Sequence, residues 1–250
     1  DTSIFISRSI AEAVYHDFTH RMCRLISHFK NFSSQSKYVL VLSSYAPAPS
    51  DSEVTEKVKE IIAKKVEANN STEVKKFLFN CIDLTTLKTE DSEESVLKFT
   101  ERVNDFDNEY PDFKGVAAIC VYPNFAATVK EARACDFNIT VVSACFPSSQ
   151  SFLEVKLKEC EMAVEQGADE VDIVLALNAF LAGDYETAAE EIRQVRACID
   201  KVAEKQGRRV HLKVILETGL LRKPELIAEA SFLAMEAGAD FIKTSTGKVD

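Results

Sequence analysis

Two charged residues occupy equivalent places in an internal repeat of this 250-residue sequence. The segments Gln166–Asp172 and Ala237–Lys243 both contain Gly-Ala-Asp and then open an apolar run. The repeat therefore puts Asp172 and Lys243 at the same position of two predicted strands. Lys213 lies near the start of the intervening apolar run, in a similar register. Ionisable side chains on buried strands are costly unless they are paired or functional, so these three need a physical reason.

Amine catalysis is one such reason. A second ammonium group and a shortage of water both lower the pKa of a lysine, which leaves a nucleophilic free amine at neutral pH. We expect Lys213 to act on Lys243 in this way, with Asp172 moving protons. In a closed barrel, alternate strands contribute side chains to one interior layer, so Asp172 and Lys243 could share a pocket. The alternative is a buried salt-bridge cluster, or side chains that point outward between helices.

The surrounding sequence predicts an α/β protein. From Phe77 onward, short apolar runs alternate with amphipathic segments, as expected for βα units around a parallel sheet. The runs are nearly continuously apolar, which is typical of strands covered on both faces. We predict strands near Phe77–Asp83, Gly115–Tyr122, Ile139–Cys145, Glu170–Leu175, Val210–Glu217 and Phe241–Ser245.

Residues 1–75 are predicted to form a separate N-terminal extension, and residues 76–250 the barrel domain. Apolar residues from Val14 to Phe29 recur at helical spacing, Tyr38–Leu42 reads as a short strand, and a second helix begins near Val54. The segment Ala46–Asp51 interrupts both patterns with two prolines.

Composition excludes several classes of function. A net charge of −10 and a pI near 5.1 argue against a nucleic-acid partner. No apolar run is long enough to suggest a membrane span. Seven cysteines without CxxC spacing suit reduced thiols and a cytoplasmic location. His16 and His20 have zinc-ligand spacing but no evident third ligand, so we expect no metal site.

Five segments in order resemble deoxyribose-phosphate aldolase, a family of class I, Schiff-base aldolases. The last of them is the most specific, and together they span about Ile82 to Lys248: Ile82–Leu87, Ala118–Pro123, Gly167–Asp172, Leu212–Gly219 and Phe241–Lys248. The resemblance implies a (β/α)8 TIM barrel, of which about six βα units are visible. Residues 1–75 carry no such match.

The resemblance also implies roles for individual residues. Lys243 matches the Schiff-base lysine, Asp172 the proton-relay aspartate and Lys213 the lysine that perturbs the nucleophile. Residues on segments that line the family's substrate pocket or follow the last strand are expected to bind substrate: Asp83, Thr85, Cys120, Thr246, Gly247 and Lys248. Cys120 is otherwise expected to be a buried packing thiol.

The implied reaction is the reversible cleavage of 2-deoxy-D-ribose 5-phosphate to acetaldehyde and D-glyceraldehyde 3-phosphate, in deoxyribonucleotide catabolism. The implied partner is a small phosphorylated sugar, no cofactor is required, and a dimer or tetramer is possible. A class I aldolase with another acceptor is one alternative.

Some positions depart from the family pattern. Cys145, Ser149 and Ala176 replace residues that are usual in relatives, and the family's Gly-Phe-Lys-Pro-Ala-Gly-Gly segment with its second lysine has no counterpart. We expect this sequence to be a fragment; two alternatives are that the N-terminal third supplies the missing strands and that the protein has lost activity. A catalytically silent homologue that binds a protein partner as a scaffold is the second functional alternative.

Overall fold

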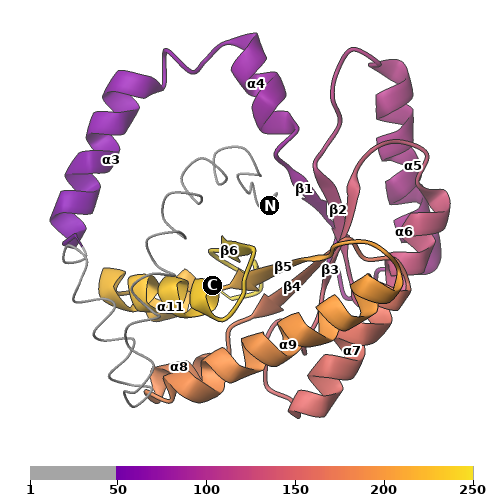
Figure 1. The fold of residues 1–250 in the computed structure, drawn as a ribbon. Coiled ribbons are helices and arrows are strands. Elements are labelled where there is room, and N and C mark those ends of the chain that lie inside the picture. The colour runs from indigo at the N-terminus through magenta and orange to yellow at the C-terminus, as the bar shows by residue number, and fades with distance from the viewer. Residues whose placement is uncertain (1–48, 250) are drawn as a thin grey trace.

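The computed structural model describes residues 49–249 (Figure 1). Helices and strands alternate along most of this range. In chain order they are α3 (Asp51–Lys65), α4 (Thr72–Phe79), β1 (Asp83–Thr85), α5 (Glu93–Glu109), β2 (Ala118–Val121), the 3-10 turn η1 (Pro123–Phe125), α6 (Ala126–Ala132), β3 (Asn138–Val142), α7 (Leu153–Glu165), β4 (Glu170–Val174), α8 (Leu177–Leu181), α9 (Tyr185–Lys205), β5 (His211–Ile215), α10 (Thr218–Leu221), α11 (Pro224–Glu236) and β6 (Phe241–Lys243).

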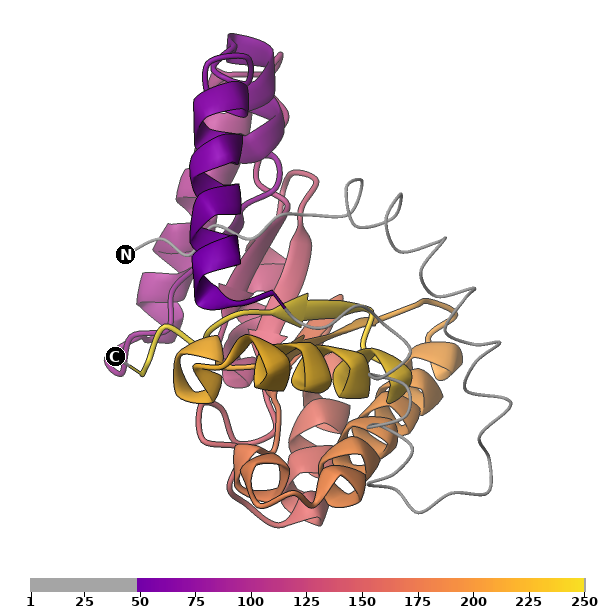
Figure 2. The same cartoon turned by 90° about the vertical axis from the view of Figure 1, so that its left-hand side faces the viewer.

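The six strands form one parallel sheet in the order β1-β2-β3-β4-β5-β6. The sheet curls, and the helices that follow β1 to β5 lie on its outer side (Figures 1 and 2). This is the architecture of a (β/α) barrel, with six of its units present in the described residues, and it confirms the predicted fold class.

The two faces of the sheet differ in chemistry because side chains alternate along each strand. On β4, Val171 and Ile173 belong to the apolar core between sheet and helices. Glu170 and Asp172 alternate with them and are buried on the inner face. The outer face therefore holds the helices, while the inner face is available for chemistry.

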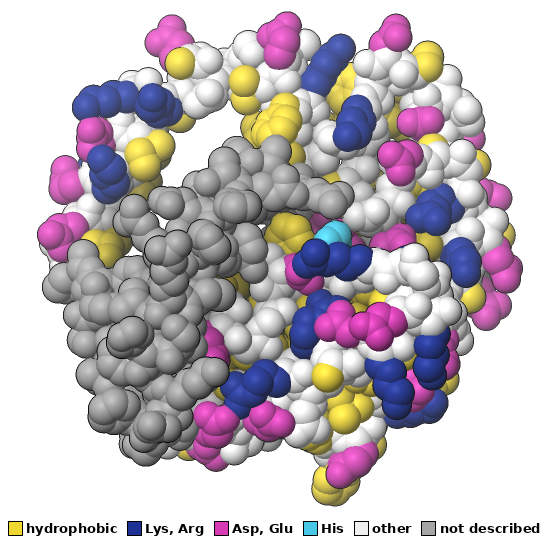
Figure 3. Space-filling view, viewed as in Figure 1, with side chains coloured by type: hydrophobic (Ala, Val, Ile, Leu, Met, Phe, Trp, Pro, Cys, Tyr) yellow, Lys and Arg dark blue, Asp and Glu magenta, His cyan; other side chains and the backbone are white. Residues whose placement is uncertain are grey.

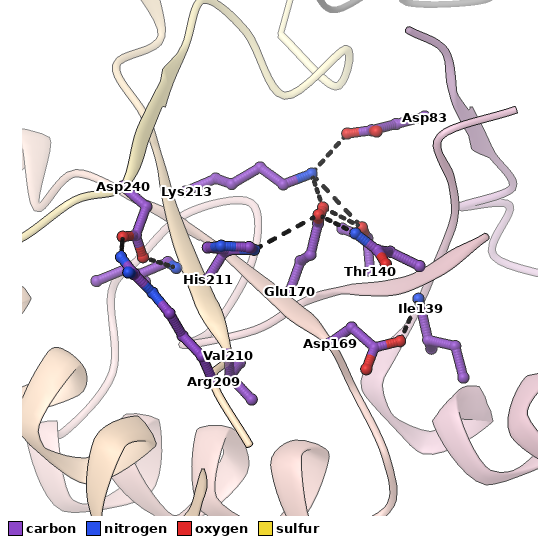
Figure 4. Close-up of polar contacts among 12 residues, drawn as sticks. Asp83, Ile139, Thr140, Asp169, Glu170, Arg209, Val210, His211, Lys213 and Asp240 are labelled. Atoms are coloured by element: carbon purple, nitrogen blue, oxygen red, sulfur yellow. Dashed lines mark hydrogen bonds and ion pairs between the residues drawn. The ribbon is translucent and has the colours of Figure 1, made fainter. Parts of the chain in front are cut away.

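The aspartates of the internal repeat link neighbouring strands at the N-terminal edge of the sheet. The Asp169 carboxylate accepts from the Ile139 N–H at 2.9 Å, and the Asp240 carboxylate accepts from the Leu212 N–H at 2.9 Å (Figure 4). Arginines pair with both aspartates; they are Arg133 and Arg208 at Asp169, and Arg196 and Arg209 at Asp240. Each repeat thus ties the start of one strand to its neighbour.

The predicted strand Phe77–Asp83 is wrong over most of its length, and only Asp83 lies in a strand. Phe79 ends helix α4, whose N-terminus is capped by the Ser71 hydroxyl, which accepts from the Val74 N–H at 3.3 Å. The Phe79 ring then packs against Phe106, with ring centroids 5.1 Å apart. A short apolar run is compatible with a helix or with a strand. Here the Ser71 N-cap and the contact between the Phe79 and Phe106 rings stabilise the helix. The other five predicted strands are confirmed; each is shorter than predicted, and β3 begins one residue earlier, at Asn138.

Helix α3 has no buried residue. Its apolar side chains are about half exposed, for example Val58 at 48% and Ile62 at 56%, and Figure 1 shows it apart from the sheet. Helix α4 crosses the predicted boundary at residue 75, and the division into an extension and a barrel stays a prediction.

Several predictions fall outside the described residues, namely the first helix near Val14–Phe29, the strand Tyr38–Leu42 and the pair His16 and His20. Within residues 49–249, no helix is long and apolar enough to cross a membrane. Acidic and basic side chains are interspersed over the described part of the surface in Figure 3.

Candidate active site on the inner face of the sheet

Lys213 is the centre of a buried charge cluster on the inner face (Figure 4). Its Nζ lies 2.6 Å from Asp83 Oδ2 and 2.5 Å from Glu170 Oε2. It also donates to Thr140 Oγ1 at 3.5 Å. Because Asp83 is on β1 and Lys213 on β5, the ion pair spans the interior of the curled sheet rather than joining neighbouring strands.

The pKa values within this cluster show a lysine held as a cation. Burial alone would lower the pKa of Lys213, but the carboxylates of Asp172, Glu170 and Asp83 outweigh burial and raise it well above its ordinary value. Burial opposes ionisation of Glu170 too, yet Lys213 and the hydrogen bonds to this carboxylate bring its pKa down to about 2. At Asp83 burial wins over the attraction of Lys213, and the pKa is raised. Lys213 is therefore suited to a fixed charge rather than a nucleophile.

Lys243 and Asp172 form a second buried pair beside the first. The Lys243 ammonium donates a hydrogen bond to Asp172 Oδ2, and the two side chains are 7% and 0% exposed. Asp172 Oδ1 lies 3.7 Å from Lys213 Nζ. Among the described residues, Asp172 Oδ1 is the only buried side-chain nitrogen or oxygen without a hydrogen-bond partner. Such an oxygen marks a place for a water molecule or a polar ligand group.

The expected lowering of the Lys243 pKa is wrong for this arrangement. Burial and the Lys213 ammonium do act to lower the pKa of Lys243, but the Asp172 carboxylate outweighs them and raises it. The sequence predicted the two ammonium groups as neighbours, but it did not show that Asp172 would contact Lys243 directly. An amine in this position must give up a proton before it can attack, and Asp172 is in contact to accept it.

Cys120 on β2 lies close enough to Asp172 and Lys243 for their charges to act on its thiol. Thr85 is in register with Cys120, and its hydroxyl donates to the Asp83 carbonyl oxygen at 3.0 Å. Burial raises the pKa of the Cys120 thiol to about 12. Cys120 is therefore a neutral packing group at the site, as expected from the sequence.

The turn Thr246–Lys248 follows β6 at the C-terminal edge of the sheet. Thr246 is buried and donates from its N–H and its hydroxyl to the carboxylate of Glu217. Lys248 is exposed, and its ammonium donates to the Leu87 carbonyl oxygen in the loop after β1. The turn therefore bridges the last described strand to the first.

Sequence reasoning missed Glu170 and Glu217 as members of this region. Glu170 lies two residues before Asp172, and alternation along the strand puts both on one face, so this signal was present. Glu217 stands within the segment Leu212–Gly219, but nothing in the spacing distinguishes it from a surface residue. Within residues 49–249, no group of three or more His, Cys, Asp or Glu is arranged to hold a metal ion.

A curled parallel sheet with helices on its outer side and a buried lysine–carboxylate pair on its inner face defines a (β/α) barrel protein. Residues 77–250 match the family described as DeoC/LacD family aldolase, and the chain belongs to that family.

Relatives of known name agree with this assignment. A deoxyribose-phosphate aldolase of Agrobacterium fabrum is 37% identical over 74% of this chain and 66% of its own length. One from Bos taurus is 37% identical over 67% of this chain and 54% of its own length. The solved structure of deoxyribose phosphate aldolase from Aeropyrum pernix, described as tetrameric, is 25% identical and aligns with a TM-score of 0.59 over 80% of this chain and 73% of its own. The matches thus cover less than two thirds of the two curated relatives.

Proposed function

We propose that this protein is a class I aldolase that reversibly cleaves 2-deoxy-D-ribose 5-phosphate to acetaldehyde and D-glyceraldehyde 3-phosphate through a Schiff base on Lys243. The observation that carries the proposal is the contact of the Lys243 ammonium with the fully buried Asp172 carboxylate inside the sheet. Family membership and the names of the relatives support the substrate class.

In the first step, Asp172 takes a proton from Lys243, and the free amine attacks the aldehyde carbon C1 of the sugar. The carbinolamine that forms loses its oxygen as water when a proton is returned to it, and an iminium results. The oxygen Asp172 Oδ1 has no hydrogen-bond partner in the described residues, which supports a role in accepting a hydrogen bond from that water or from a substrate hydroxyl.

In the second step, the bond between C2 and C3 breaks. Its electron pair stays with C2 and is delocalised into the positive iminium nitrogen, while the C3 hydroxyl loses its proton and becomes the aldehyde of glyceraldehyde 3-phosphate. Protonation of C2 and addition of water to the iminium then release acetaldehyde and restore the amine. The Lys213 cation contacts Asp83, Glu170 and Asp172 and supplies a fixed positive charge beside the reacting groups while these charges change.

Borohydride reduction with acetaldehyde tests the proposal. We expect a stable ethyl adduct on the peptide that contains Lys243. Lys243→Arg is the matched control, because it keeps a cation beside Asp172 but has no amine that forms a Schiff base, and we expect no adduct and no cleavage of 2-deoxyribose 5-phosphate.

The remaining outcomes separate the alternatives. An adduct on Lys213, or on no lysine, contradicts the mechanism. An adduct on Lys243 without cleavage of 2-deoxyribose 5-phosphate indicates a Schiff-base aldolase with another substrate. A protein that does neither would favour the alternative of a catalytically silent homologue that acts as a binding scaffold. Assembly into a dimer or tetramer stays a prediction.

A further inference from the structure

Glu217 has a backbone conformation that a glutamate rarely adopts. It lies two residues after the end of β5 and is the N-cap of helix α10, with φ 53° and ψ 60° in the left-handed region. Hydrogen bonds on both sides hold it there, from the Leu216 N–H to the Lys243 carbonyl oxygen at 2.9 Å and from the Thr218 N–H to the Thr244 carbonyl oxygen at 2.8 Å. A residue with a Cβ is disfavoured in this region by steric contact with the backbone, so its surroundings must impose the conformation.

The Glu217 side chain is buried, at 3% exposure, and points to the turn after β6. The Thr246 N–H donates to its two oxygens at 3.2 and 3.3 Å, and the Thr246 hydroxyl donates to Oε2 at 2.5 Å. Thr246 Oγ1 in turn accepts from the Lys248 N–H at 3.1 Å. A continuous series of hydrogen bonds thus runs from the Glu217 carboxylate through Thr246 to Lys248.

Burial of a carboxylate is unfavourable unless ion pairs or hydrogen bonds replace its contacts with water. Which groups supply these contacts indicates the role of the carboxylate. Within residues 49–249, Glu217 forms no ion pair, unlike the carboxylates that contact Lys213 and Lys243. Its described partners are the two donors of Thr246. A carboxylate presents two accepting oxygens to these donors, whereas an amide presents one accepting oxygen and one NH2 donor.

The turn that Glu217 holds leaves one backbone donor open. Gly247 is exposed with φ 71°, and its N–H donates to no acceptor in the described part of the chain. The N–H groups of Thr246 and Lys248 on either side are already used. The turn therefore presents the Gly247 N–H at the C-terminal edge of the sheet, four residues after Lys243, where anions are bound by backbone donors in barrels of this type.

We propose that Glu217 is a positioning residue that fixes the Thr246–Lys248 turn for the phosphate end of the substrate, without taking part in the carbon–carbon chemistry at Lys243. This rests on the proposed function, because a sugar phosphate must bridge from Lys243 to the turn. The same geometry predicts selectivity, since an unphosphorylated sugar would not use the turn and would not depend on Glu217.

Glu217→Gln is the sharpest variant, because it preserves size and places an amide donor against one of the donors of Thr246. An unsatisfied buried donor costs about 1 to 3 kcal/mol, which corresponds to roughly a five- to 150-fold change in an equilibrium constant. We expect KM for 2-deoxyribose 5-phosphate to rise about tenfold, with kcat and the kcat/KM for unphosphorylated 2-deoxyribose changed by less than about twofold. Glu225→Gln, the same substitution at an exposed position of α11, is the matched control.

A second measurement is independent of turnover. The dissociation constant for inorganic phosphate, followed by calorimetry on the intact protein, should rise by a similar factor in Glu217→Gln and stay unchanged in Glu225→Gln. Equal losses on both sugars, a fall in kcat alone, or equal phosphate affinity in wild type and Glu217→Gln would overturn the inference.

Failure of the proposed function gives a different result. The wild-type protein would then form no acetaldehyde adduct on Lys243, whereas the phosphate titration still decides the role of Glu217. Wild-type protein that binds no inorganic phosphate would refute that role even if Lys243 is trapped.

Discussion

Lys243 on β6 donates a hydrogen bond to Asp172 on β4 across the strand between them, although 71 positions separate the two residues in the chain. By strand pairing, Asp172 is level with Lys213, and Lys213 is level with Phe241, two residues before Lys243. The long lysine side chain and the stagger of tilted strands in a barrel together account for the contact. Asp172 is thereby a partner of both lysines.

Asp172→Asn should make Lys243 react as an amine at lower pH. The Asp172 carboxylate stabilises the ammonium form and raises the pKa of Lys243, so its removal lets burial dominate and the pKa falls. Aldol cleavage should nevertheless drop by about 10² to 10⁴-fold, because the variant lacks the proposed proton acceptor. The measurement is the pH dependence of borohydride trapping with acetaldehyde, with the exposed Asp136→Asn as control. If the pH midpoint of trapping in Asp172→Asn is equal to or higher than that of the wild type, the result contradicts the contact between Lys243 and Asp172.

Glu170→Gln should destabilise the protein in a pH-dependent way. The variant leaves Lys213 with one fewer carboxylate, and breaking a buried ion pair costs about 3 to 5 kcal/mol. The pKa of Glu170 is about 2 in the folded protein against an ordinary 4.5, so its stabilisation is complete above pH 4.5 and is lost as the pH falls toward 2.

Chemical unfolding at a series of pH values checks this expectation. The difference in the free energy of unfolding between wild type and Glu170→Gln should be largest at neutral pH and shrink between pH 4.5 and 2. The exposed Glu165→Gln, at the end of α7, should show little difference at any of these values. A difference that is constant with pH would mean that Glu170 acts through packing rather than charge.

Gly238→Ala should weaken the Arg–Asp contacts at the N-terminal edge. Gly238 has φ +109°, and an added Cβ would lie 3.1 Å from Cγ of Arg196, the residue that pairs with Asp240. We expect a loss of about 1 to 3 kcal/mol in the free energy of unfolding by denaturant. Gly219→Ala meets no atom within 4 Å and lies in helix α10, so it should be neutral or slightly stabilising. Equal effects of the two substitutions would count against a role for backbone strain.

The strand positions and the inward charges could be read from the sequence because they depend on local patterns. The Gly-Ala-Asp repeat predicted equivalent places for Asp172 and Lys243, and the apolar runs predicted five of the six strands. The direction of the pKa shift of Lys243 could not be predicted, because it depends on whether Asp172 or Lys213 lies closer to the Lys243 ammonium. The partner of Glu217 could not be found either, since Thr246 is 29 residues away and reaches it only through the left-handed turn.

The order of strands in the sheet has a consequence for assembly of the protein. Each strand pairs with its predecessor, so the sheet can grow one βα unit at a time as the chain is synthesised. The pair between Lys213 and Asp83 closes a separation of 130 residues and cannot form until β5 is added. A sheet that stops at β4 would enclose Asp83, Glu170 and Asp172 without the cation that all three contact. Strand β5 therefore supplies the positive charge that compensates the three buried carboxylates.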